Sequence, residues 1–184
     1  MSNQACLFAE NTPDVVGPDS PRRDRRRTKT VFFAGCAWQV PVFWLFCFDS
    51  EDLSDYECND GSLIPTLVSH MDRVRARLAE RDALARSLFP QYVSVWEKWR
   101  QAVEKIKRTF LKTSLCEIWC LYEDDTYFKN SLSAALDFLR GEEPDGLEDL
   151  VTLAGIMTYD RKTCTFTFDE DRECAEKFLY GWLE

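Results

Sequence analysis

The sequence is poor in the residues on which enzyme chemistry most often depends. It holds one histidine, His70, among 184 residues, and general acid–base catalysis uses histidine more often than any other side chain. No Gly-x-Ser-x-Gly turn is present to hold a nucleophilic serine. The seven glycines are too scattered to form a dinucleotide-binding or phosphate-binding loop. We therefore predict no catalytic residue and no cofactor.

Glycine and proline are also scarce, with seven residues of each, and no internal repeat is visible. Repeat proteins and low-complexity chains are therefore excluded. Hydrophobic residues make up 45% of the sequence and aromatic residues 14%, which is enough for one core in a chain of this length. We predict a single domain over residues 1–184, in which residues 14–29, rich in proline and arginine, form a flexible loop.

Eight cysteines are present, but their pattern favours neither disulfides nor a metal site. Disulfide frameworks are typical of small secreted chains, whereas cysteines in apolar segments are expected to be reduced and buried. The only close pair, Cys116 and Cys120, would lie about 13 Å apart on a strand, too far to share one zinc ion. Residues 49–60 lack the spacing of an EF-hand loop, so we predict no metal. The cysteines expected in the core are Cys36, Cys47, Cys116, Cys120 and Cys164.

The net charge of −9 is distributed unevenly along the chain. Residues 30–61 contain six acidic residues and no lysine or arginine, whereas residues 62–112 contain eleven basic and five acidic residues. Residues 113–184 are again acidic, with seventeen carboxylates against six basic side chains. A largely acidic surface attracts basic proteins and repels nucleic acid. We expect a basic protein as the partner and no nucleic acid; a solvated surface without a binding role is the alternative.

One uncharged segment, 31–48, follows an arginine cluster and has the length of a short membrane anchor. Gln39 and Pro41 lie at its centre and divide it into two pieces of strand length. We interpret these pieces as buried strands of a cytoplasmic protein and do not expect membrane association; an anchor is the alternative.

The hydrophobic pattern predicts both strands and helices. Apolar residues spaced three and four apart predict two helices separated by Pro90, which together form a basic helical hairpin over 67–112. Shorter helices are expected before Gly141, after Asp145 and near the C-terminus. The fold class is therefore α+β, a mostly antiparallel sheet with the long hairpin and the shorter helices packed on it. The predicted strands are 4–9, 30–38, 42–48 and 115–122, with a hairpin at 156–159 and 163–168.

Short segments near the N-terminus resemble small bacterial cytosolic proteins of the toxin-immunity type. They are Asn-Gln-Ala-Cys-Leu-Phe-Ala at 3–9, Trp-Gln-Val-Pro-Val-Phe-Trp at 38–44, Leu-Phe at 45–46, and Glu-Asp-Leu at 51–53. The resemblance implies a protein without enzymatic activity that binds and blocks a toxin or another partner. It assigns no role to any single residue.

The acidic segment 49–60, which follows the uncharged segment 31–48, is the candidate binding site. Its carboxylates surround Leu53 and Tyr56, and such a combination suits an apolar anchor inside a charged rim. We expect lysine at Asp52 and Asp55 to weaken partner binding with little effect on melting temperature. The predicted partner-binding residues are Asp49, Glu51, Asp52, Leu53, Asp55, Tyr56, Glu57 and Asp60.

Two other functions stay open at this point. The basic hairpin 67–112 carries aromatic residues and could bind nucleic acid, although Trp96 and Trp99 lie on its apolar stripe and not among its lysines. An enzyme with a carboxylate or thiol site that has no sequence signature is the third hypothesis.

Overall fold

The computed structural model describes residues 4–13, 31–37, 40–57, 63–115, 125–142, 144–154, 157–168, 176 and 179–183. Several predicted features lie outside this part of the chain: the loop 14–29, most of the strand 115–122 with Cys116 and Cys120, and most of the helix expected near the C-terminus.

A six-stranded antiparallel sheet forms one layer of the molecule. Its order is β3-β4-β5-β1-β2-β8, so β3 lies at one end of the sheet and β8 at the other. The strands are β1 (Gln4–Glu10), β2 (Val31–Ala37), β3 (Leu53–Glu57), β4 (Leu63–His70), β5 (Phe110–Ser114) and β8 (Trp182–Leu183).

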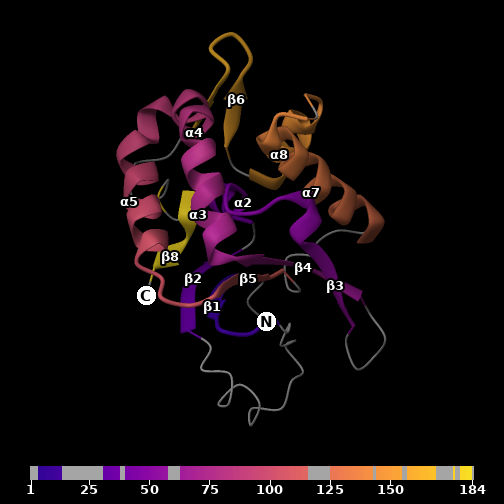
Figure 1. Ribbon diagram of the computed structural model, residues 1–184. Coiled ribbons are helices and arrows are strands. Elements are labelled where there is room, and N and C mark those ends of the chain that lie inside the picture. The colour runs from indigo at the N-terminus through magenta and orange to yellow at the C-terminus, as the bar shows by residue number, and fades with distance from the viewer. Residues whose placement is uncertain are drawn as a thin grey trace.

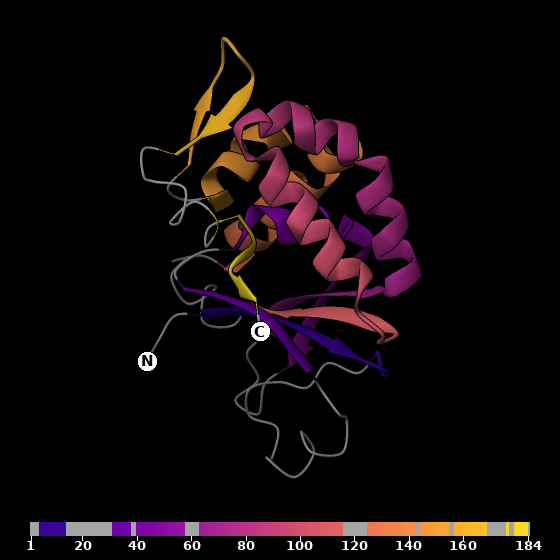
Figure 2. The same cartoon turned by 90° about the vertical axis from the view of Figure 1, so that its left-hand side faces the viewer.

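Helices form a second layer over one face of this sheet, as Figure 2 shows from the side. The fold is therefore α+β, as predicted. A small hairpin of β6 (Thr158–Asp160) and β7 (Thr165–Thr167) projects from the helical layer, away from the sheet (Figure 1). The helices are α2 (Val42–Leu45), α3 (Met71–Glu80), α4 (Asp82–Leu88), α5 (Val93–Glu104), α7 (Asp125–Arg140) and α8 (Gly146–Ala154), with 3-10 turns η1 (Ser50–Asp52) and η2 (Pro90–Tyr92).

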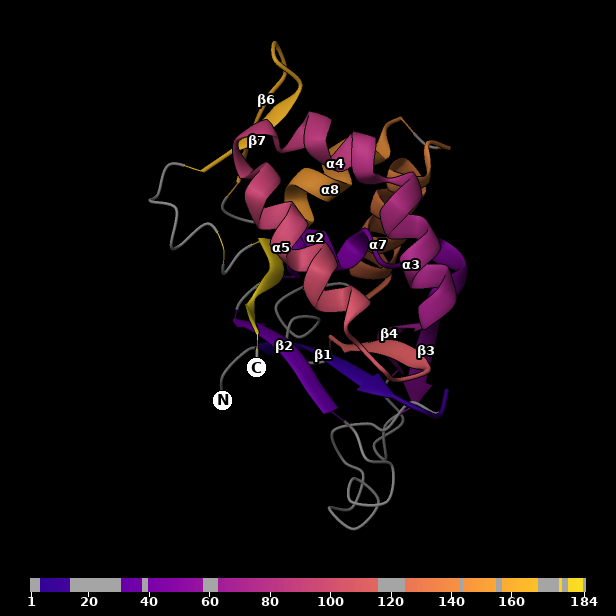
Figure 3. The same ribbon diagram turned by 60° about the vertical axis from the view of Figure 1, so that its left-hand side comes forward.

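The segment 42–48 is the first correction to the sequence-based prediction, because it forms helix α2 and no strand. Every residue of α2 is fully buried, and Figure 3 shows the helix between α5 and α7. A short apolar run that is buried on all sides has no polar face to reveal its period, so strand and helix cannot be told apart. Phe43 and Phe46 contact Trp96 of α5 at ring-centroid distances of 5.0 and 5.1 Å, which makes α2 the aromatic centre of the core.

The helical hairpin is the second correction, because residues 63–70 and 110–114 belong to strands β4 and β5. Leu67 is four residues before Met71, which fits a helix face, but the helix begins only at Met71. His70 precedes it in extended conformation and accepts a hydrogen bond from the backbone N–H of Asp72, at 3.3 Å. The hairpin itself is present: α3 and α4 lead away from the sheet and α5 returns to it (Figure 1).

Two glycines shape the turn between α7 and α8. Gly141 ends α7 with φ +86°, and its N–H and that of Glu142 donate to the carbonyl oxygens of Phe138 and Asp137. A Cβ at Gly146 would lie 2.1 Å from the carbonyl oxygen of Ala134, so only glycine lets α8 approach α7 this closely.

Cys47 and Cys164 are free thiols, and the side chain of Cys36 lies outside the described part of the chain. Cys47 is buried, as predicted, and Cys6 is half-buried. Cys164 is the third correction: it lies exposed in the turn between β6 and β7 with φ +55°, because that hairpin projects from the core. Within the described residues, no helix is long and apolar enough to cross a membrane.

Candidate binding pocket

Part of the acidic segment is turned inward. The side chain of Asp52 is 4% exposed and that of Asp49 is 14% exposed. Asp52 also closes the 3-10 turn η1, because its Oδ2 accepts a hydrogen bond from the backbone N–H of Asp49 at 3.0 Å. These two carboxylates therefore hold the segment against the body of the protein.

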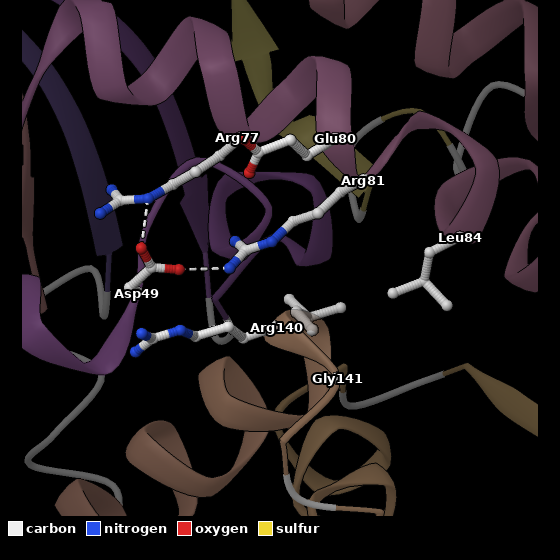
Figure 4. A pocket seen from close by; sticks show the side chains of 8 residues that line it. Asp49, Arg77, Glu80, Arg81, Leu84, Arg140 and Gly141 are labelled. Atoms are coloured by element: carbon white, nitrogen blue, oxygen red, sulfur yellow. Dashed lines mark hydrogen bonds and ion pairs between the residues drawn. The ribbon is translucent and has the colours of Figure 1, made fainter.

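Two arginines one turn apart, Arg77 of α3 and Arg81 directly after it, pair with these carboxylates. Asp49 bridges them: one of its oxygens pairs with Nε of Arg77 and the other with Nη2 of Arg81 (Figure 4). Nη1 of Arg77 also donates to Asp52 and, at 2.8 Å, to Oγ of Ser69 in β4. Buried ion pairs stabilise a fold only if their charges are matched and hydrogen-bonded. The two arginines and two aspartates meet both conditions.

Backbone carbonyl groups complete the arrangement. Nη1 of Arg81 donates to the carbonyl oxygens of Phe48 and Phe46 at 2.6 and 3.2 Å, and Nη1 of Arg77 donates to that of Cys47 at 3.3 Å. The carbonyl oxygens at the end of the α2 segment have no helical N–H donors, and the arginines supply the missing donors. The cluster thus joins α3, the sheet, η1 and the end of the α2 segment.

Burial changes the protonation chemistry of this cluster. Burial lowers the pKa of Arg81, and the charge of Asp49 and its hydrogen bond oppose that effect. Burial raises the pKa of the Cys47 thiol to about 12, against the opposing influence of Arg81. Cys47 is therefore a protonated thiol at neutral pH and unsuited to act as a nucleophile.

A cavity of about 320 Å³ lies beside the cluster, between α3, α4, η1 and the end of α7 (Figure 4). Asp49 lies at one end and Leu84 at the other, and Leu139 also lines the cavity. A side chain at Gly141 would meet no atom within 4 Å, so the backbone borders open space there. The lining residues are Asp49, Arg77, Glu80, Arg81, Leu84, Leu139, Arg140 and Gly141.

Four exposed carboxylates lie on the elements next to this cavity, and one of them, Glu80, lines it. Glu51 of η1, with its side chain 65% exposed, and Glu142 both pair with Arg140, at 3.3 and 3.1 Å. Asp55 of β3 pairs with Lys129 of α7 at 2.6 Å. Glu80, at the end of α3, is exposed and has no ion pair with any described residue. We refer to Glu51, Asp55, Glu80 and Glu142 as the acidic surface.

The predicted site residues thus divide into two groups. Glu51 and Asp55 are exposed, whereas Asp49 and Asp52 are bound inside the protein and Leu53 packs against the core. Tyr56 and Glu57 belong to β3, but their side chains, like all of Asp60, lie outside the described part of the chain. Lysine at Asp52 would disturb a buried ion pair, so D52K/D55K cannot test the surface alone; this corrects the expectation of an unchanged melting temperature.

Sequence reasoning missed the basic half of the site and Glu80. The sequence predicted a basic hairpin there but gave Arg77 and Arg81 no part in the site, and the two residues are only 7% and 6% exposed. One signal was available: residues 30–61 hold six carboxylates and no cation, so their buried members had to find cations elsewhere in the chain.

The cations of the α4–α5 hairpin are largely paired with carboxylates. Arg86 and Arg100 both bind Asp82, at 2.8 and 2.6 Å, and Lys98 binds Glu176 at 3.0 Å. Trp96 and Trp99 are fully buried, so neither ring can stack on a base. The hypothesis that this hairpin binds nucleic acid therefore gains no support.

No cluster of three or more His, Cys, Asp or Glu residues able to hold a metal ion occurs within the described ranges. Comparison with protein-family models, with curated proteins and with solved structures gives no match.

Proposed function

We propose that this chain is a non-enzymatic cytoplasmic protein that binds a basic protein through the acidic surface, in the manner of an immunity-type inhibitor. One observation carries the proposal: the outward carboxylates of Glu51 and Asp55 lie on a segment whose inward carboxylates are locked by buried arginines. A binding surface that is already ordered loses little conformational entropy when it binds.

The charges of this surface favour a cationic partner. Its four carboxylates face two cations, Lys129 and Arg140, which leaves a local charge of 4 − 2 = 2 negative charges. Exposed ion pairs such as these contribute about 0–1 kcal/mol each, so the cations of a partner can compete for the carboxylates. The overall charge of −9 adds long-range attraction, which mainly raises the association rate.

The cytoplasmic part of the proposal is supported by the free thiols of Cys47 and Cys164, since a reducing compartment keeps cysteines in that state.

The proposal is tested with the charge-reversed variant E51K/D55K. The wild-type protein and the variant are used as baits in extracts of the source cells, and captured proteins are then purified for binding kinetics. We expect the variant to lose a basic protein that the wild type retains, mainly through a lower association rate that differs most at low salt. Both side chains are exposed, so we expect the free energy of unfolding to change by less than about 0.5 kcal/mol per site.

The matched control is E97K/E104K, which makes the same change of charge on α5, at a distance from α7 (Figure 1). Its side chains are 49% and 57% exposed, between the 65% of Glu51 and the 30% of Asp55. The control should retain the partner. Equal capture and equal association rates for wild type and E51K/D55K would refute the proposed surface.

A further inference from the structure

The cavity beside the arginine cluster at first resembles a site for an anion, because Arg77, Arg81 and Arg140 all line it. Their charges are already matched, however. Arg77 pairs with Asp49 and Asp52, and Arg81 shares Asp49. These two arginines and two aspartates sum to zero, so the deep end of the cavity offers no excess positive charge to a ligand.

The rim of the cavity is negative. Arg140 has two carboxylate partners, Glu51 and Glu142, and Glu80 adds a third carboxylate without a described cation. Three arginines and two carboxylates, Asp49 and Glu80, line the cavity. The arginines have three further ion-pair partners outside the lining, which are Asp52, Glu51 and Glu142, so the balance of the whole group is 3 − 5 = −2. A cation gains from this balance, and an anion would have to displace carboxylates from the arginines.

The apolar side chains that line the cavity favour a cation with an aliphatic part. Leu84 lies at the end opposite to Asp49, as Figure 4 shows. Leu139, which is only 2% exposed, also lines the cavity. Lysine and arginine side chains place an aliphatic stem along such apolar surface and keep the charged group at a polar end. A volume of about 320 Å³ is at the small end for ligand pockets and suits a single side chain.

We infer that this cavity receives one lysine or arginine side chain of the bound protein, with the stem against Leu84 and Leu139 and the cationic group at Glu80. The inference rests on the proposed function, because it takes the basic partner from there. It adds a specific anchor point, on α3 and α4, to a surface otherwise defined by η1, β3 and the end of α7.

The test uses small probes and needs no partner. Nα-acetyl-arginine methylamide and its lysine counterpart are titrated into the ¹⁵N-labelled protein, and backbone amide shifts are followed. We expect saturable shifts at Glu80, Leu84 and Gly141 with a dissociation constant on the order of millimolar, as befits one side chain. The citrulline analogue, which has the same stem and no charge, should bind about tenfold more weakly.

Two variants locate the effect. E80Q keeps the shape of the side chain and removes its charge, so it should weaken the arginine probe about tenfold, since it removes a charge-assisted contact. E97Q makes the same change on α5 and should leave the affinity unchanged. Equal binding of the citrulline and arginine probes, tighter binding of inorganic phosphate or of the glutamate analogue, or an E80Q variant with wild-type affinity would each overturn the inference.

Failure of the inference can be told from failure of the proposed function. If the probes do not bind but E51K/D55K still loses the partner, the acidic surface stands and the cavity has no part in it. If the probes bind and E51K/D55K keeps the partner, the cavity binds cations but the proposed surface is wrong.

Discussion

Replacing Arg77 with leucine removes the cation at the centre of the buried cluster. Arg77 is joined to Asp49 and Asp52 and donates to Ser69, and its own side chain is 8% exposed. After the substitution, Asp49 keeps Arg81, but Asp52, with its side chain 4% exposed, has no arginine partner. Breaking a buried pair in this way costs about 3–5 kcal/mol, because the remaining charge stays in a poorly solvated site.

That cost is large compared with the whole stability of a domain, which is about 5–15 kcal/mol. For a domain of this size each kcal/mol lowers the melting temperature by about 2–4 °C, so R77L should melt roughly 6–20 °C below the wild type. Chemical denaturation at neutral pH measures the free energy directly. We expect R77L/D52N to recover part of the loss, because it removes the unpaired charge as well.

Arg73 supplies the control, since it lies exposed on the same helix. R73L should change stability by no more than about 0.5 kcal/mol. If R77L costs less than about 1 kcal/mol, or no more than R73L, then the cluster does not hold the acidic segment in place and the argument for an ordered binding surface fails.

The remaining predictions concern protonation and thiol reactivity. Partial burial works to raise the pKa of Asp82, but hydrogen bonds from Trp96, Arg86 and Arg100 outweigh it and lower that pKa to about 2. Because the folded-state pKa is depressed, Asp82 contributes stability above its unfolded-state value of about 3.9 and loses it as the pH falls to about 2. D82N should be less stable than the wild type by about 1 kcal/mol at neutral pH, allowing for solvent screening. The free energies of unfolding of the two proteins, measured by chemical denaturation, should converge near pH 2. A difference that stays constant with pH would contradict this. Iodoacetamide followed by peptide mass spectrometry should label exposed Cys164 at pH 8 and spare Cys47, whose pKa burial raises to about 12; comparable labelling in the folded protein would contradict the burial of α2.

The sequence predicted those elements whose two faces differ. In α5, Trp96, Trp99 and Val103 are fully buried whereas Glu97 and Gln101 are exposed, and this spacing of three and four residues is visible in the chain. The spacing of hydrophobic residues does not identify α2 as a helix, because α2 is buried on every side. The spacing also fails at the junction of β4 and α3, where Leu67 and Met71 continue one spacing through two kinds of structure.

The candidate site was predictable only in part, because the charge of a side chain does not show whether it points to solvent or into the protein. The six carboxylates of 30–61 mark an acidic segment, but nothing local tells which of them turn inward. Asp49 and Asp52 are bound by arginines 25 to 32 residues away in the sequence, and the cavity depends on Arg140, still farther along. Contacts of this separation arise from tertiary packing, and helix periodicity does not encode them.

The place of β3 at the end of the sheet bears on self-association. A terminal strand offers main-chain groups that a strand from another molecule can pair with, which is a common start of aggregation. Asp55 lies exposed on β3, and Glu51 is exposed just before it. If two copies of the protein paired along β3, their carboxylates would lie opposite one another and repel. The strand is therefore protected against pairing with a second copy, whereas a positively charged strand of another protein could still pair with it.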